Sequence, residues 1–376
     1  MNVETAKRQE PRFKQTYCKE LNIKQWGEDN AYPQRMFAHI SSSATGAACL
    51  SRLISFLEGD GVTNVSIGEA IVNKHGDTWD DIVHAVANDY GTYGGFALHV
   101  RYNAAAEIAE ITPLSFAACR LEETTKNGDT FRIVVHPDWT EQDTRGGEQL
   151  RVTKDTVERY PVFNPSADVV RSQIIRAGGV EEYGGQVLWV SSAGGMNYPT
   201  PVYDAAVTDI CVDEGVSNVL YRNVKNNFLP AGAFVHKKGE TVQGNDDDDG
   251  LSEQLDTFTG DTNAAALIDV TIERDEDKPE FIQMRGANFD KEFTGSDAIS
   301  ATKIYTAFKQ EPWLCIRQGK VGFGGDVMRD AYNIYNRETK NARRLIERNL
   351  TRIFNRWTLK QYYDGDGYIE IKTLSV

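Results

Sequence analysis

The sequence has few cysteines, no long apolar run and no excess of basic charge. Its five cysteines are an odd number, stand far apart and include no CxxC pair. This pattern argues against a disulfide framework and a zinc site, and it favours buried thiols. No apolar run approaches the roughly 18 residues that cross a bilayer, and the opening residues, MNVETAKRQEPRFKQ, lack the apolar core of a signal peptide. We therefore expect a soluble protein that is made in a cytoplasm and has no membrane partner.

Recognisable catalytic and metal-binding motifs are also missing. The six histidines form no HxH or HExxH pair, no GxSxG sequence occurs, and no cysteine stands in a context typical of a nucleophile. The acidic loop GNDDDDG at residues 244–250 lacks the alternating ligands and the bidentate glutamate of a calcium loop. The segment GKVGFGG at residues 319–325 lacks the Lys-Ser/Thr pair of a phosphate-binding loop. We expect a solvated loop and a flexible connection at these two places, and neither enzyme activity nor a metal or cofactor.

Negative charge dominates the chain as a whole. The formal net charge is −14, which argues against a conventional nucleic-acid-binding protein, because such a protein needs a basic face to replace counterions. The average hides a gradient: between Arg337 and Lys360, eight basic residues stand against two glutamates. This segment therefore carries +6 and the remainder −20. One basic helix on an acidic body is typical of a functional surface, but an ordinary solvated helix face produces the same pattern.

Composition and periodicity predict an α+β fold. Hydrophobic residues make up 40% of the 376, enough for two or three packed modules. Apolar residues at three- and four-residue steps predict helices at 33–57, 78–90, 202–227, 251–260, 289–308 and 327–360. Aromatic and β-branched runs predict strands at 96–103, 106–116, 130–137, 160–165, 172–177, 185–192, 231–238, 265–273 and 280–284. Residues 60–195 should form an antiparallel module, residues 362–372 a hairpin, and residues 1–30 little regular structure.

The stretch WGEDNAYPQ, residues 26–34, opens the organised part of the chain. Its oxygen-bearing side chains have the chemistry of a hard-cation site, and equally that of a turn and a helix cap. Pro33 suits the first turn of a helix, and Asn30 stands where a cap is expected. We favour the helix start, in which Asp29 and Asn30 lead into the helix of residues 33–57.

Four stretches carry a resemblance to a known family, through their order more than through any single motif. They are residues 27–61 (opening GEDNAYPQ and closing LEGDG), residues 90–123 (opening YGTYGGFALHV), residues 198–235 (opening YPTPVYDAAV), and ISATKIYTAFKQEPWL with the later Arg337–Trp357 helix. In this order they resemble the portal proteins of tailed bacteriophages and prophages. Those proteins form the ring through which the genome enters and leaves the head.

The resemblance implies an architecture and a set of partners. It implies a wing, a helical stem, a small β-rich clip and a long C-terminal helix, in a homo-oligomeric ring of about twelve subunits. The expected parts are an N-terminal arm (1–30), the wing (31–201), two stem helices (202–227 and 289–309), the clip (228–288), a tunnel loop (310–325), and an inner wing with reduced crown (326–376). The ring would lie at the portal vertex of the virion, after synthesis in a host bacterial cytoplasm. Its partners would be the terminase packaging motor, a head–tail adaptor, the major capsid and scaffold proteins, and non-specifically bound double-stranded DNA.

Candidate site residues follow from this layout. A like-charged channel wall keeps the duplex from binding tightly; the candidate carboxylates are Asp204, Asp209, Asp213 and Glu214. Plain solvent exposure or matching of the helix dipole is their alternative explanation. The candidate DNA contacts near the tunnel loop are Lys309, Arg317 and Lys320. The basic helix offers DNA, or acidic neighbours in the ring, a set of five: Arg343, Arg344, Arg348, Arg352 and Arg356. The candidate docking patch for the motor or adaptor is Asp246, Asp247, Asp248 and Asp249.

Two other functions stay open on the sequence. Another head or connector protein would share the acidity and the absence of catalytic motifs, but not the four ordered stretches. A metal-dependent nuclease built on dispersed carboxylates would have to cleave DNA in the presence of Mg²⁺.

Overall fold

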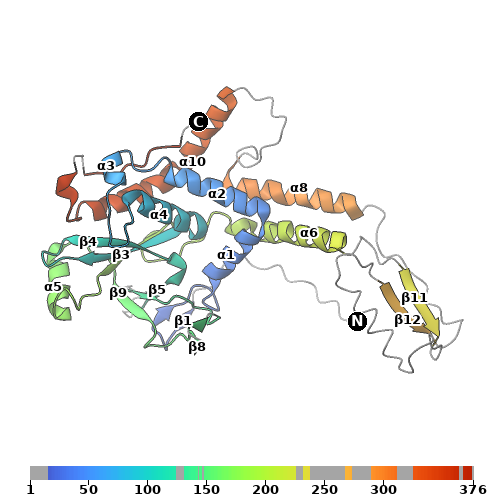
Figure 1. Cartoon of the computed structure of the whole chain (residues 1–376), viewed down its shortest axis with the longest axis horizontal. Coiled ribbons are helices and arrows are strands. Elements are labelled where there is room, and N and C mark those ends of the chain that lie inside the picture. Colours follow the sequence, from blue (N-terminus) through green and yellow to red (C-terminus); the bar gives the residue numbers. More distant parts are fainter. Residues whose placement is uncertain are drawn as a thin grey trace. The chain divides into compact units, whose positions relative to one another are not determined.

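Figure 1 presents a computed structural model of the chain. The structure describes residues 16–123, 131–142, 144–145, 148–225, 232–237, 267–272, 289–310, 325–363 and 367–374. The chain forms two compact units, one made of Met1–Ile210 with Thr302–Val376 and the other of Cys211–Ala301. Helices and antiparallel sheets make up the first unit, so the predicted α+β class is confirmed.

The first helical region is broken where a single helix was predicted. The structure has α1 (Tyr32–Ser42) and α2 (Ala44–Glu58), separated by Ser43 in an extended conformation. The buried Ser43 hydroxyl accepts a hydrogen bond from the Gly46 amide at 2.9 Å, and thereby caps α2. The apolar stripe runs through the break, so periodicity alone predicted one helix. The chain forms two helices because Ser43 caps the second one.

The helix that follows, α4 (Trp79–Tyr93), confirms the prediction for residues 78–90. Thr78 and Asp81 form a capping box: the Asp81 amide donates to the Thr78 hydroxyl, and the Thr78 amide donates to the Asp81 carboxylate. One side of α4 is buried against α2, β3 and β4. Gly91 allows this close approach, because a Cβ there would lie 2.9 Å from Ile54 Cγ1. A short helix, α3 (Val65–Gly68), precedes α4.

Two antiparallel sheets complete the core of the first unit. One has the order β10-β3-β4, with β10 (Gln186–Ser191), β3 (Gly95–Tyr102) and β4 (Ile108–Leu114). The other has the order β1-β2-β5-β6-β9, with β1 (Tyr17–Cys18), β2 (Ile23–Lys24), β5 (Cys119–Glu122), β6 (Arg132–Val135) and β9 (Glu158–Pro161). A two-residue ladder joins β7 (Thr144–Arg145) and β8 (Glu148–Gln149). Cys49 and Cys119 are buried, as expected for structural thiols.

Three predictions for the first unit are wrong. The segment predicted as a strand at 172–177 belongs to α5 (Ala167–Ala177), whose apolar residues Val170 and Ile174 are spaced for a helix and are buried. Residues 17–24 are not loosely structured, because β5 pairs with β2 and so orders the hairpin of β1 and β2. The hairpin at 362–372 is absent from the described residues there. Instead Thr63 donates to the Glu370 carbonyl at 2.8 Å and Lys372 to the Gly61 carbonyl at 2.8 Å.

The longest helix, α10 (Gly325–Phe354), ends six residues before the predicted end at 360. Its inner face packs on α2, where Phe56 contacts the rings of Tyr332 and Tyr335. Phe354, its last residue, and Trp357, just beyond it, lie edge-on to Trp79 at 5.7 Å between ring centres. The Thr358 amide donates to the Ile108 carbonyl at 2.9 Å. The C-terminal helix is thus anchored to α4 and β4.

Two further helices and a strand pair follow the predicted order. The short η2 (Asp204–Ala206) leads into α6 (Val207–Lys225), and α8 (Phe289–Phe308) confirms the helix predicted at 289–308. The second unit contains β11 (Gly232–Lys237) and β12 (Leu267–Ile272), both predicted as strands and paired in parallel. The helix predicted at 251–260 and the strand predicted at 280–284 lie outside the described residues.

Candidate functional site

A buried tyrosine contacts the short η2 segment that leads into α6. Tyr32, in the first turn of α1, donates its hydroxyl to Asp204 Oδ1 at 2.5 Å. Burial, followed by the hydrogen bond and the negative charge of Asp204, raises the pKa of Tyr32 far above its usual value. The phenol therefore stays protonated and acts as a donor at any physiological pH. Asp204, a candidate channel carboxylate, is half-buried in this contact.

The remaining candidate carboxylates differ in their surroundings. Asp209, in the first turn of α6, forms an ion pair of 2.8 Å with Lys303 of α8. Nearby, Tyr203 and Phe308 stack with 5.7 Å between ring centres. In the second unit Asp213 is only 6% exposed, and Glu214 is half-buried. The four acids are therefore not a row of fully exposed carboxylates in the isolated chain.

The end of α8 is held by a buried glutamine. Lys309 ends the helix in the left-handed region, with φ of 54°. Gln310 is 5% exposed, and its Nε2 donates to the Cys49 carbonyl at 2.8 Å and to Tyr335 Oη at 2.6 Å. The Lys309 ammonium pairs with Glu338 of α10 at 3.0 Å. The candidate DNA contact Lys309 thus already has a partner in the chain, whereas Arg317 and Lys320 lie outside the described residues.

The five arginines of the basic helix do not share one face. Arg343 is buried and donates to the Phe56 carbonyl at 2.9 Å, and Arg356 donates to the carbonyls of Pro165 and Ala106. Arg352 lies over the Phe163 ring and donates to Asn349 at 3.1 Å. Arg344 and Arg348 point into solvent. The proposed docking residues Asp246, Asp247, Asp248 and Asp249 lie outside the described residues.

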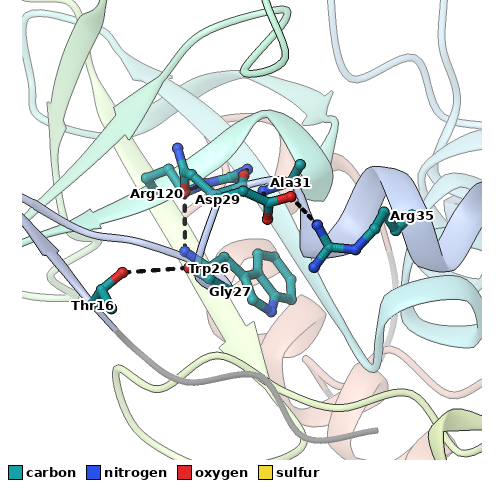
Figure 2. Close-up of polar contacts among 8 residues, drawn as sticks. Thr16, Trp26, Gly27, Asp29, Ala31, Arg35 and Arg120 are labelled. Carbon is teal, nitrogen blue, oxygen red and sulfur yellow. Dashed lines mark hydrogen bonds and ion pairs between the residues drawn. The ribbon is translucent and has the colours of Figure 1, made fainter. Parts of the chain in front are cut away.

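The opening stretch WGEDN is a turn, but not through the cap that was predicted. Ala31 is the N-cap of α1, with no side-chain cap hydrogen bond. Asp29 accepts from the Ala31 amide at 3.1 Å and pairs with Arg35, as Figure 2 shows. Asn30 adopts a left-handed conformation (φ 60°) and turns inward, where its Oδ1 accepts from the Trp26 amide at 3.0 Å. The predicted role of Asn30 as a helix cap is therefore wrong.

The partner of Asn30 is an arginine that sequence reasoning missed. Arg120, on β5, is fully buried and donates to Asn30 Oδ1 and to the Asn30 carbonyl at 2.5 and 2.6 Å. It also donates to the carbonyls of Ala117 and Cys119, each at 2.8 Å. Its guanidinium lies 4.8 Å from the centre of the Trp139 ring and 5.8 Å from the centre of the Trp26 ring. Figure 2 shows Arg120 and Trp26.

Neutral partners thus surround a buried cation. Burial lowers the pKa of Arg120 to about 10, so the side chain stays charged, and the carbonyl dipoles and ring faces compensate its lost hydration. Arg120 joins the residue 26–30 turn to β5 across 90 positions of sequence. No local pattern announces that contact.

Among the described residues, metal-ligand groups and membrane-spanning helices are both absent. No group of three or more His, Cys, Asp or Glu among them is arranged to hold a metal ion. No helix within the described ranges is long and apolar enough to span a membrane. The observed polar clusters connect helices, turns and strands, and so hold these elements together.

Comparison with solved structures finds the same fold in phage-like particles. A chain from the neck of an empty gene transfer agent (GTA) particle, computed with C6 symmetry, matches with a TM-score of 0.50 at 13% identity, over 91% of this chain and 84% of that chain. A chain of the native GTA virion matches with a TM-score of 0.45 at 15% identity, over 91% and 83%. A chain of the native GTA neck, computed with C12 symmetry, matches with a TM-score of 0.46 at 15% identity, over 93% and 84%.

No protein-family model matches the sequence, and no curated protein matches it either. At these identities the likeness to the GTA structures is one of fold. The chain therefore shares its fold, over nine-tenths of its length, with a component of the neck of a gene transfer agent particle.

Proposed function

We propose that this chain is the portal protein of a phage-like particle, a subunit of the ring through which double-stranded DNA is packaged and ejected. The observation that carries the proposal is the fold match to a neck component over 91% of the chain. The four ordered stretches of the sequence support it independently, because their order resembles that of portal proteins. The function is structural, and we propose no catalytic activity.

The polar contacts between helices of the first unit suit such a role. DNA would be driven through the centre of the ring. Each subunit would then have to transmit force between its helices without deforming. The Tyr32–Asp204 contact ties η2 to α1, and the Asp209–Lys303 contact ties the first turn of α6 to α8. The buried Gln310 ties the end of α8 to α2 and α10. The buried hydrogen bonds of Gln310 resist sliding, because breaking one leaves a desolvated polar group.

Formation of a ring and its number of subunits can be tested by measuring assembly. The neck structure that shares this fold was computed with C6 symmetry, which a ring of six or twelve subunits satisfies. We propose a ring of about twelve subunits, placed at the portal vertex of the virion. Its partners would be the packaging motor, the head–tail adaptor, and the capsid and scaffold proteins.

Native mass spectrometry of the purified protein tests the proposal. We expect a dominant species close to twelve times the 42.0 kDa subunit mass, or at a neighbouring stoichiometry. A stable monomer or dimer, unchanged by added scaffold protein, would contradict the ring. Mg²⁺-dependent cleavage of DNA by the same sample, abolished when Asp246 to Asp249 are substituted together, would favour the nuclease instead.

A further inference from the structure

The outward side of α10 carries a row of cations, which we call the outer α10 face: Arg337, Lys340, Arg344 and Arg348. All four side chains are exposed. Their spacing of three, four and four residues places them within about 80° of arc, in a row about 16 Å long, at 100° and 1.5 Å per residue. Arg343, one position and so about 100° from Arg344, lies outside this arc and is buried.

Within the part of the chain that the structure describes, this row has no ion-pair partners. None of the four forms an ion pair within the described residues, although the chain as a whole carries 55 acidic residues. Other exposed cations do find carboxylates: Arg35 pairs with Asp29, Lys303 with Asp209 and Lys372 with Asp60. The outer α10 face is therefore a local concentration of uncompensated positive charge on an acidic protein.

Two exposed asparagines accompany this row. Asn333 falls within the same arc, and Asn341 lies about 20° beyond its edge. Glu338, the one acid among the neighbouring positions 333–348 that is exposed, is engaged by Lys309 at 3.0 Å. Arginine, lysine and asparagine together are the side chains that contact phosphate oxygens, and three of the four cations are arginines, whose planar fork matches a phosphate.

We propose that the outer α10 face binds the phosphodiester backbone of double-stranded DNA without reading its sequence. A duplex presents one negative charge about every 1.7 Å of its axis, so a 16 Å row of cations lies opposite several phosphates at once. The identification of the polyanion as duplex DNA rests on the proposed function. The row of unpaired cations does not depend on it. Such contacts are weak and salt-screened, which suits a duplex that has to move.

The test compares two variants with the same net charge. The face variant carries Arg337→Gln, Lys340→Gln, Arg344→Gln and Arg348→Gln, and glutamine is nearly as good a helix former as arginine. The control variant removes four exposed cations from other elements by the same change, at Lys74, Arg151, Lys154 and Arg176. Binding of a 30-base-pair duplex to the full-length protein is measured between 50 and 200 mM salt, about the range in which phosphate contacts dominate. Circular dichroism and native mass are recorded for each variant.

For the face variant we expect the slope of log affinity against log salt to flatten by about 3. The affinity at 50 mM salt should fall at least about tenfold, while the control keeps the slope of the parent. Equal slopes in all three proteins, equal losses in both variants, or no binding by the parent would overturn the proposal. If the face variant loses its fold, the double variant Arg344→Gln with Arg348→Gln decides, with an expected flattening of about half as much.

The readouts separate this inference from the proposed function. A face variant that binds DNA like the parent but no longer assembles would assign the row to contacts between subunits and overturn the inference. A parent that binds DNA through this row but forms no ring would uphold the inference and contradict the portal.

Discussion

The two faces of α10 use the same residue type in opposite ways. On the inner face Arg343 is 5% exposed and donates to the Phe56 carbonyl, to Thr339 Oγ1 at 3.3 Å and to the Asn336 carbonyl at 3.2 Å. On the outer face Arg344 projects into solvent with no ion pair among the described residues. The difference teaches that an arginine becomes structural when carbonyl acceptors surround it. Without such acceptors the arginine stays exposed to solvent.

Arg120 extends the comparison beyond this helix. It has neutral acceptors and ring faces for partners, as Arg343 has carbonyl and hydroxyl oxygens. Neither of them is part of an ion pair within 4.0 Å among the described residues. Their shared property is that several guanidinium N–H groups donate to neutral acceptors inside the fold. The following predictions compare such internal residues with exposed counterparts.

The largest effect is expected for Arg120→Met. The change removes four hydrogen bonds and leaves the carbonyls of residues 30, 117 and 119 without that donor, so the free energy of unfolding should fall by about 3 kcal/mol. Urea unfolding followed by tryptophan fluorescence measures the loss. The control is Arg132→Met on the neighbouring β6, an exposed residue, with a change within about 0.5 kcal/mol. Equal losses in both variants would contradict an internal role specific to Arg120.

The second effect is a pH dependence that originates at Asp89 on α4. Burial raises the pKa of Asp89 to about 7, against the weaker opposite effect of the hydrogen bond from the Phe116 amide at 3.0 Å. The unfolded chain releases this proton near pH 4 and the folded chain keeps it up to about pH 7. The stability contributed by the protonated form is therefore complete below about pH 4 and lost as the pH rises to 7.

An Asp89→Asn variant isolates this effect. Its amide oxygen accepts the same hydrogen bond without ionising, so between pH 4 and 7 the parent should lose on the order of 2 kcal/mol relative to the variant. Thermal unfolding in buffers spanning this range gives the comparison. A constant difference between the two proteins across the range would show that Asp89 does not titrate there.

The two faces of α10 are compared directly by Arg343→Gln and Arg344→Gln. The first removes the donors to Phe56 and Asn336 and should cost about 2 kcal/mol of unfolding free energy, whereas the second should change it by less than about 0.5 kcal/mol. Both variants lose one charge and stand at neighbouring positions of one helix. Similar unfolding free energies for the two variants would contradict the distinction between the inner and the outer face of α10.

The smallest effect is expected for the exposed pair of Lys309 and Glu338. A double-mutant cycle with Lys309→Gln and Glu338→Gln should give a coupling of about 0.5 kcal/mol or less, declining with salt. A coupling above about 1.5 kcal/mol would mean that the pair, rather than the buried Gln310, holds the end of α8.

Elements with strong local signals could be predicted from the sequence. A cap at Asp77 or Thr78, followed by a clear apolar stripe, predicted the start of α4, and the structure adds Asp81 as the partner of Thr78 in a capping box. The strands β3 and β4 were recognised because β-branched and aromatic residues stand between glycine or polar turns. The difference between Arg343 and Arg344 was not predicted, because both were placed on one basic face, although the sequence carries a signal for it. Arg343 follows Thr339 by four residues and precedes Ile346 and Leu350 at helical spacing, on the apolar side.

The failures have physical causes that act over longer distances. Residues 172–177 are rich in isoleucine and so match a strand composition, yet Val170 and Ile174 bury one face of a helix. The last residues pair with the chain after α2 rather than with themselves. Arg120 finds its acceptors 90 residues upstream at Asn30, and no composition or period encodes that contact. The candidate site was thus predicted as a set of charges, while the internal partners of those charges required the fold.

The most direct test of the portal assignment is electron microscopy of the purified full-length protein. Class averages should show closed rings with an open central channel, and their subunit count should agree with the native mass. Compact single subunits or open filaments, under conditions in which the protein is folded and scaffold protein is present, would contradict the account.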